Sequence, residues 1–187
     1  MGAELKPEQF RGYLRVLAHT LLQNAGPVRA KVDASDLVQE TLLKAHTALG
    51  QFRGSTTGEF AAWLRRILAN QFADVTRHFG RHKRDVGLEQ RYRETLDHSA
   101  SNLERLVVVD QPTPADHLLR FERILRLADA LDVLPADQRA ALELHHLMGL
   151  GVAEIATQME RTHAGVAGLL RRGLKKLRAN LADAESL

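Results

Sequence analysis

Apolar side chains recur every three or four positions along most of this chain, and no stretch alternates apolar and polar residues as a half-buried strand does. Such stripes predict helices over residues 10–21, 37–49, 60–79, 121–131 and 135–148. Gly26-Pro27 and Gly50 end the first two helices, and Ser35 is the expected N-cap of the second. Pro114 and Pro135 each open a later helix. The fold class predicted is all-α.

The segment 152–181 predicts a helix-turn-helix. A short helix has Val152, Ile155, Ala156 and Met159 on its inner face, and Thr162 is the expected N-cap of a longer helix. The longer helix keeps Val166, Leu170, Leu174, Leu177 and Leu181 on one side and basic residues on the other. DNA-binding proteins of this layout place the second helix in the major groove, although many helical hairpins resemble it.

Composition and pattern divide the chain into two small helical domains, 1–85 and 114–187, joined by a linker over 86–113. Within the linker the apolar periodicity weakens and polar residues cluster at 97–102, so that only a short helix over 103–107 is expected there.

The composition narrows the function classes. Of the 187 residues 44% are hydrophobic, enough for a core, and the absence of Cys excludes disulfides, thiolate metal sites and cysteine nucleophiles. Apolar runs are too short to span a bilayer, and the N-terminus lacks the apolar stretch of a signal peptide. We therefore expect a soluble, cytoplasmic protein without membrane insertion.

Basic residues are concentrated in two places, although the net charge is only +3. Six lie between Arg161 and Arg178 with no acidic residue among them, and a second group covers 77–84. Two separate basic faces favour a polyanion contacted at two places, and the alternative is two solvated helix faces.

No catalytic chemistry is predicted. The sequence has no nucleophile motif, no Gly-rich phosphate loop and no recognisable carboxylate pair. His78 and His82 stand four positions apart, and His145 and His146 are adjacent, but neither pair has an apparent third metal ligand. We expect no enzyme activity, no metal and no cofactor; a metal hydrolase using His78 and His82 is the weakest of the alternatives.

Ordered motifs in both halves resemble the sigma-70 family of RNA polymerase sigma factors, specifically its extracytoplasmic-function (ECF) group. In the first half, DLVQET at 36–41, FRG at 52–54, FxxWLxxI at 60–67, Asn70 and DxxR at 74–77 resemble region 2. In the second half, LP at 134–135, GVAEIA at 151–156 and LxRGxxxLR at 170–178 resemble region 4.

The resemblance implies a factor that binds core RNA polymerase, directs it to promoters and promotes DNA opening. Its partners would be the polymerase β′ clamp helices, the β flap and promoter DNA, and an anti-sigma factor is common in the group. The residues implied in docking on the polymerase are Asp36, Leu37, Gln39 and Glu40. The alternative is a stand-alone helix-turn-helix regulator, which leaves residues 36–77 without a role.

The resemblance also assigns the DNA contacts. Capture of the opened −10 strand is implied for Phe52, Arg53, Gly54, Ser55, Thr56, Thr57, Arg66, Asn70, Arg77 and Arg81, with Arg65 as a further phosphate ligand. Phe60, Trp63, Phe72 and Phe79 lie on the apolar stripe and are expected in the core. Reading of the −35 duplex is implied for Thr162, His163, Gly165, Ala167, Gly168, Arg171, Arg172 and Lys175.

The recognition helix departs from the group's usual pattern. Where the group commonly has Thr-Val-(Lys/Arg)-Ser-Arg, this chain has Gly165-Val166-Ala167-Gly168-Leu169. Small apolar residues therefore replace the long hydrogen-bond donors. Either close approach of the backbone replaces side-chain readout, or the chain depends more on the −10 element.

Overall fold

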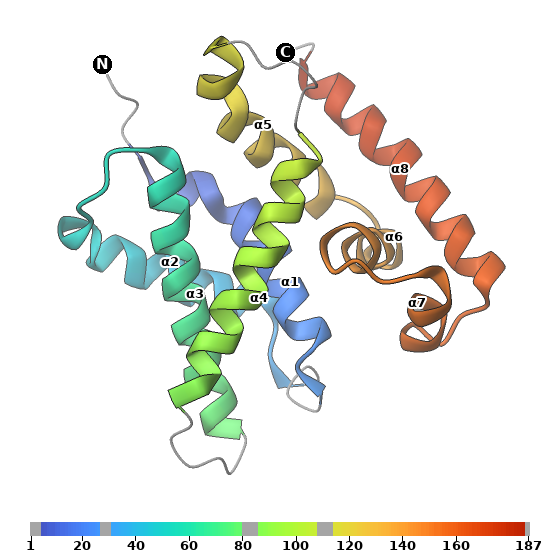
Figure 1. Ribbon diagram of the computed structural model, residues 1–187, viewed down its shortest axis with the longest axis horizontal. Helices are drawn as coiled ribbons and strands as arrows, with labels where there is room; N and C mark the ends of the chain where they lie inside the picture. The colour runs from blue at the N-terminus through green and yellow to red at the C-terminus, as the bar shows by residue number, and fades with distance from the viewer. Residues whose placement is uncertain (1–4, 27–30, 80–85, 108–113, 186–187) are drawn as a thin grey trace. The chain divides into compact units, whose positions relative to one another are not determined.

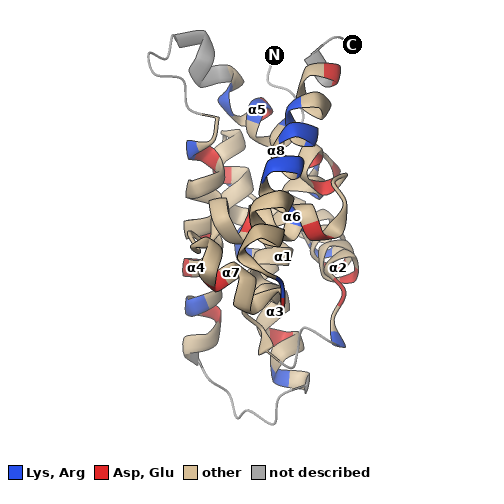
Figure 2. Cartoon of the chain, turned by 90° about the vertical axis from the view of Figure 1, so that its right-hand side faces the viewer, with Lys and Arg blue, Asp and Glu red and all other residues tan. Residues whose placement is uncertain are grey.

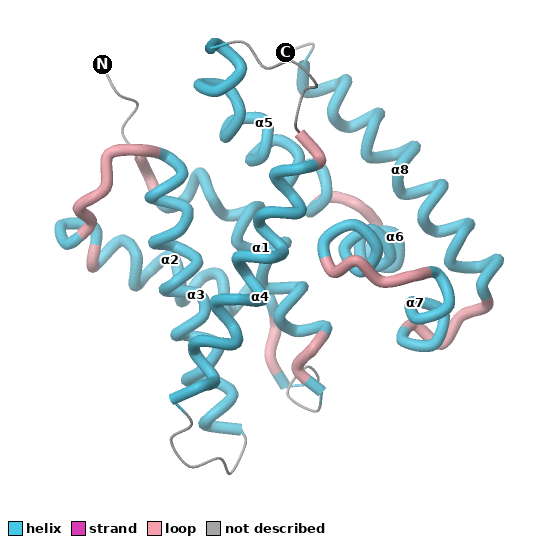
Figure 3. Tube along the Cα trace, in the orientation of Figure 1, coloured by secondary structure: helices cyan, strands magenta, loops and turns pink. Residues whose placement is uncertain are grey.

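The computed structural model describes residues 5–26, 31–79, 86–107 and 114–185, which are helical apart from short turns and loops (Figure 3). No strand occurs in these ranges, and the all-α prediction is confirmed. None of the helices described is both long and apolar enough to cross a bilayer. The chain divides into two compact units, Met1–His98 and Ser99–Leu187.

The first unit is built on three helices, α1 (Arg11–Gln23), α2 (Ala34–Thr47) and α3 (Thr57–Phe79), with short 3-10 turns η1 (Pro7–Phe10) and η3 (Leu49–Gln51) beside them (Figure 1). The predicted stripes form its core. The fully buried side chains with the largest volumes include Phe10, Tyr13, Leu14, Leu17, Leu21, Phe60, Leu64, Leu68 and Phe72. Because the α3 members recur every four residues, one face of this 23-residue helix is buried and the other faces solvent.

The N-cap of α2 is Asp33 and not Ser35. The Asp33 carboxylate accepts a hydrogen bond from the Ser35 backbone N–H at 2.6 Å, and the helix begins at Ala34. Asp and Ser are comparable N-cap residues, so the prediction of Ser35 placed the cap two residues too late.

Helix α4 (Val86–Arg105) occupies most of the predicted linker, so the expectation of only a short helix over 103–107 is wrong. Its buried stripe mixes small and polar residues with the large ones, which weakened the apolar signal. The Tyr92 ring packs against Phe72 at 4.7 Å between centroids, and Leu96, Ser99 and Leu103 are buried. Residues 108–113 lie outside the described ranges, and the division into domains at 85 and 114 remains a prediction.

The second unit contains α5 (Pro114–Asp132), α6 (Ala136–Leu142), α7 (Val152–Gln158) and α8 (His163–Glu185). Helix α6 continues into a π-helical turn, η4 (Glu143–Leu147), and Gly149 ends it with a φ of +75°. Gly173 of α8 is buried against α6, because a Cβ there would lie 3.0 Å from Leu142 Cδ1. The bare Cα of Gly173 therefore lets the two helices pack closely.

The predicted helix-turn-helix is confirmed as α7, a four-residue turn and α8. Its small core consists of Leu144, Ile155, Ala156 and Val166. Thr162 caps α8 as predicted, since its hydroxyl accepts the Gly165 backbone N–H at 3.0 Å.

The turn closes with a Schellman motif that holds a glutamate in the left-handed region. The Arg161 N–H donates to the Ala156 carbonyl at 2.9 Å, and the Glu160 N–H donates to the Thr157 carbonyl at 3.3 Å. Glu160 has a φ of +52°, where glycine is the usual residue. A side chain in this conformation costs roughly 1–2 kcal/mol.

Glu160→Gly should therefore raise the free energy of unfolding of the second unit by about 1 kcal/mol. Thermal melting followed by circular dichroism measures the change. Glu122→Gly, on an exposed face of α5, is the matched control and should lower it by about 1 kcal/mol. Equal destabilisation by both variants would contradict the strain assigned to Glu160.

Candidate nucleic-acid interface

An open hollow of about 490 Å³ lies between the 51–54 loop and the first turns of α3 in the first unit. Four of its wall residues are among those assigned to the −10 strand, namely Phe52, Arg53, Gly54 and Arg66. The rest of the wall is Gln51, Glu59, Ala62 and Trp63. A hollow of this size is large enough to accept a single base.

Aromatic rings form one side of the hollow. The Phe52 ring packs on Phe60 and Trp63, with centroids 5.0 and 5.5 Å away. Phe60 and Phe72 are fully buried, as predicted. Trp63, expected in the core, is only partly buried and lies in the wall. It therefore offers the hollow a ring on which a base can stack.

Gly54 is needed for the close packing of the loop. A Cβ at Gly54 would lie 2.4 Å from Phe52 Cζ and 2.9 Å from Glu59 Cβ, distances at which atoms overlap. The absence of a side chain at Gly54 thus lets the loop fold over the Phe52 ring.

The lip of the hollow is held by a capping box at the start of α3. One Glu59 carboxylate oxygen accepts the backbone N–H groups of Ser55 and Thr56 at 2.8 and 3.0 Å, and the Thr56 hydroxyl accepts the Glu59 N–H at 3.2 Å. These hydrogen bonds to the ionised form lower the pKa of Glu59 below its usual value. The Ser55 and Thr56 amides, expected to face DNA, are therefore already bound to Glu59.

The arginines of α3 differ in how far they are available to a ligand. Arg65 donates to the Tyr13 hydroxyl and to Asp97, each at 2.8 Å, and its side chain is mostly buried. Arg77 is held between Asp74 and Glu89. Arg66 is exposed and has no ion pair within the described ranges. Arg66 is thus the α3 arginine best placed for a phosphate.

The other residues assigned to the −10 strand lie in the loop before α3 or on α3 itself. Asn70 is exposed one turn after Arg66, and Thr57 is partly buried. Arg53 is exposed and donates to the Gly50 carbonyl at 3.1 Å. Arg81 lies outside the described residues.

The start of α2 presents an acidic and polar face. Asp36, Gln39 and Glu40 are exposed, whereas Leu37 is 3% exposed and belongs to the core. Leu43 lies one turn further along this face and is 63% exposed. The exposure of Leu43 was not predicted, because Leu43 directly follows the buried Leu42 in the apolar segment of α2.

In the second unit, α8 carries the predicted basic face, shown in blue in Figure 2. Of the residues predicted to read the −35 duplex, the N-cap Thr162 and five residues of α8 are exposed, namely His163, Ala167, Arg171, Arg172 and Lys175. Gly165 and Gly168 are partly buried. Arg161, just before the helix, pairs with Asp137 at 2.9 Å. By contrast, Arg171, Arg172, Lys175 and Lys176 have no ion pair to any residue that the structure describes, so their charges are available to an external anion.

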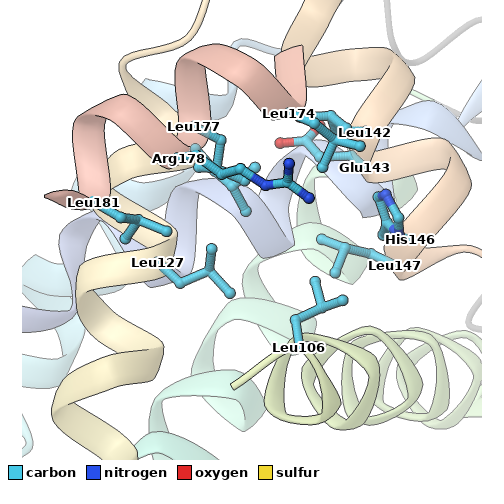
Figure 4. A pocket seen from close by; sticks show the side chains of 11 residues that line it. Leu106, Leu127, Leu142, Glu143, His146, Leu147, Leu174, Leu177, Arg178 and Leu181 are labelled. Carbon is cyan, nitrogen blue, oxygen red and sulfur yellow. The ribbon is translucent and has the colours of Figure 1, made fainter. Parts of the chain in front are cut away.

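Arg178 lies at the edge of this face and is exposed, but its side chain is directed elsewhere. It reaches over a leucine-lined cavity of about 180 Å³, with its guanidinium directed toward the side where Glu143 and His146 lie (Figure 4). Burial and the neighbouring His145 lower the pKa of His146, which favours its neutral form. None of the residues assigned to DNA or polymerase lines this cavity.

Within the described ranges no three His, Asp or Glu side chains come together as metal ligands. His78 is exposed on α3, and His82 lies outside the described residues.

Family models match both units. Residues 8–84 match "Sigma-70 region 2" and residues 124–177 match "Sigma-70, region 4". SigL of Mycobacterium tuberculosis, an ECF RNA polymerase sigma factor, is 30% identical over 150 residues, which cover 80% of this chain and 75% of SigL. The chain belongs to the ECF group of the sigma-70 family.

Two further relatives are longer than the matched part. The RNA polymerase sigma-H factor of Pseudomonas aeruginosa is 32% identical over 130 residues, covering 68% of this chain and 62% of that protein. The ECF sigma factor SigE of Mycolicibacterium smegmatis is 30% identical over 155 residues, covering 82% of this chain and 54% of SigE. The chain thus spans less than two thirds of the length of these two sigma factors.

Gly54→Ala should displace the Phe52 ring and expose Trp63 of region 2, because the new Cβ overlaps that ring. Trp63 is the only tryptophan in the chain, so its emission maximum should shift to the red. Gly58→Ala is the matched control, since a Cβ there meets nothing within 4 Å, and it should leave the emission unchanged. An unchanged spectrum in Gly54→Ala would contradict the packing described.

The lowered pKa of Glu59 predicts a pH dependence of the same loop. Because the pKa of Glu59 is lower in the folded than in the unfolded chain, its ionised carboxylate stabilises the folded state at pH values above the unfolded pKa. This stabilisation is lost as the pH falls through the folded pKa and the carboxylate is protonated. Trp63 fluorescence and thermal stability should therefore change below about pH 4.5. Glu59→Gln should remove this part of the transition, and an identical acid profile in the variant would refute the role of the cap.

Proposed function

We propose that this chain acts as a sigma factor that binds core RNA polymerase, selects promoters and promotes strand opening, without chemistry of its own. The observation that supports the proposal is that one chain carries two surfaces of different kinds, each suited to a different form of DNA. Region 2 has a base-sized hollow with an aromatic wall, and region 4 has an exposed helix with four basic residues that form no ion pair to any described residue. The first suits an unstacked base and the second suits a duplex.

The hollow supports capture of the opened −10 strand. Trp63 and Phe52 provide a stacking surface, and Arg66 and Asn70 stand exposed on successive turns of α3. In this proposal Arg66 binds a phosphate and Asn70 hydrogen-bonds a base edge. Arg65 and Arg77 instead hold region 2 together through their carboxylate partners.

The start of α2 supports docking on the polymerase. Asp36, Gln39 and Glu40 supply polar and acidic contacts, and Leu43 supplies an apolar anchor on the same face. We assign this face to the β′ clamp helices and the −35 duplex to α8, with the β flap as a further contact of region 4. Such a protein works inside the cell, on the bacterial genome.

The stand-alone regulator is the second candidate, and the unpaired basic face of α8 is what favours it. It would bind an operator as a dimer without polymerase, and it gives the hollow and the α2 face no role. Dependence on core polymerase therefore separates the two functions.

Run-off transcription tests the proposal. Purified chain and bacterial core polymerase, on a pool of fragments from the source genome, should give defined transcripts. Asp36→Arg combined with Gln39→Ala should reduce them at least tenfold, because it reverses a charge and removes an amide at the docking face. Asp183→Arg, an equal charge change on exposed α8, should transcribe as the unmodified chain does.

Co-elution with core polymerase and thermal melting accompany these assays, so that loss of folding is not mistaken for loss of docking. Absence of both transcripts and co-elution with the unmodified chain would overturn the proposed function. A footprint of the chain alone on a palindromic site would then favour the stand-alone regulator.

A further inference from the structure

The leucine-lined cavity of about 180 Å³ in the second unit is formed by α5, α6, η4 and α8 together with Leu106. Leucine side chains make up most of its wall, among them Leu127 of α5 and Leu181 of α8 (Figure 4). A dry, leucine-lined cavity of roughly 150 Å³ binds one benzene ring. This cavity therefore has room for an aromatic ring with one or two small substituents. Leu106 and Arg178 in its wall are exposed, so a ligand can enter from solvent.

Three polar side chains lie on one side of this apolar cavity. The Nε2 atom of His146 is buried and has no hydrogen-bond partner among the described residues. Arg178 forms no ion pair with any described residue, and its guanidinium is directed toward the side of His146 and Glu143. A buried polar atom without a partner costs free energy. A ligand that hydrogen-bonds to Nε2 would recover this free energy.

Glu143 and His146 both belong to the π-helical turn η4. The Met148 N–H donates to the Glu143 carbonyl at 3.1 Å, with the five-residue spacing of a π-helix. Such turns are rare and occur frequently at functional sites. Placing a carboxylate and an imidazole beside leucines costs free energy, so this arrangement favours a binding role over a purely structural one.

The charges on this side of the cavity favour a neutral ligand. The Glu143 carboxylate, which is 3.9 Å from Arg139 Nε, would repel an anion, and the Arg178 guanidinium would repel a cation. Burial and the neighbouring His145 lower the pKa of His146, which favours the neutral imidazole. A hydroxyl group can both donate and accept, so it can bond to Nε2 whichever ring nitrogen carries the proton.

We propose that this cavity binds a small, neutral aromatic alcohol of the phenol class. The ring lies among the leucines, and the hydroxyl bonds to His146 Nε2 and accepts a hydrogen bond from Arg178. Because the wall comes from several helices, the ligand stabilises the second unit when it binds. None of the residues assigned to DNA or polymerase lines the cavity, so the inference goes beyond the proposed function and does not depend on it.

Isothermal titration calorimetry and thermal melting of the full chain test the inference, with 4-methylphenol as the probe. It should bind at a single site and raise the melting temperature, as a ligand specific for the folded state does. Toluene should bind about tenfold more weakly, because it leaves His146 Nε2 without a partner. The anion 4-methylbenzoate should also bind at least tenfold more weakly, because it meets Glu143.

Three variants locate the site. His146→Leu should weaken binding of 4-methylphenol about tenfold and leave that of toluene unchanged, since it removes the hydrogen bond but keeps an apolar wall. Leu127→Trp should abolish binding of both, because the indole fills the cavity. Leu181→Phe, at a partly buried position, is a second filling variant and should weaken both. Leu119→Trp, at an exposed position of the same helix α5, is the matched control and should bind as the unmodified chain does.

Circular dichroism establishes that each variant is folded before its binding is compared. Failure of 4-methylphenol to bind the unmodified chain, or tighter binding of 4-methylbenzoate, would overturn the inference. Equal weakening of 4-methylphenol and toluene by His146→Leu would also overturn it, because His146 would then only pack. Unchanged binding in the folded filling variants would place the ligand elsewhere and contradict the proposed cavity.

Discussion

Burial of one apolar stripe on each of two 23-residue helices, α3 and α8, decides which of their residues remain for partners. One face of α3 packs into the core through Phe60, Leu64, Leu68 and Phe72. Arg66 and Asn70 lie on the other face and are exposed to solvent. In α8 the buried positions are Val166, Gly173 and Leu177, and the basic residues between them are exposed to solvent. Because a helix turns by a fixed angle per residue, burial of one face determines which residues are exposed on the other, so the surfaces proposed to bind partners follow from the cores.

Close packing at two glycines refines these surfaces. Gly54 lets the loop before α3 fold onto Phe52, and this keeps the aromatic wall of the hollow in place. Gly168 lets the Arg172 guanidinium lie along α8. At Gly54 the missing side chain determines where the Phe52 ring can lie, whereas a Cβ at Gly168 would shift the flexible Arg172 side chain only slightly. A base-sized hollow and a low, charged helix face are the kinds of surface that single-stranded and duplex DNA require.

Long periodic elements were predictable from sequence, and long-range pairings were not. The stripes of α1, α2, α3 and α8 and the Thr162 cap are local patterns, and the structure has them where they were expected. Helix α4 was missed because its buried positions include the polar Ser99 and the small Ala100, which weaken the apolar stripe that predicts a helix. The ion pair of Arg65 with Asp97 joins residues 32 positions apart, which periodicity cannot detect.

Strand opening is the central claim, and permanganate reactivity of promoter thymines measures it most directly. On a promoter recovered with this chain, thymines around the −10 element should become reactive when the chain and core polymerase are both present. Neither component alone should produce the reactivity, and Trp63→Ala should reduce it while the complex still forms. Protection of the duplex by the chain alone, with no reactive thymines after core polymerase is added, would contradict the account.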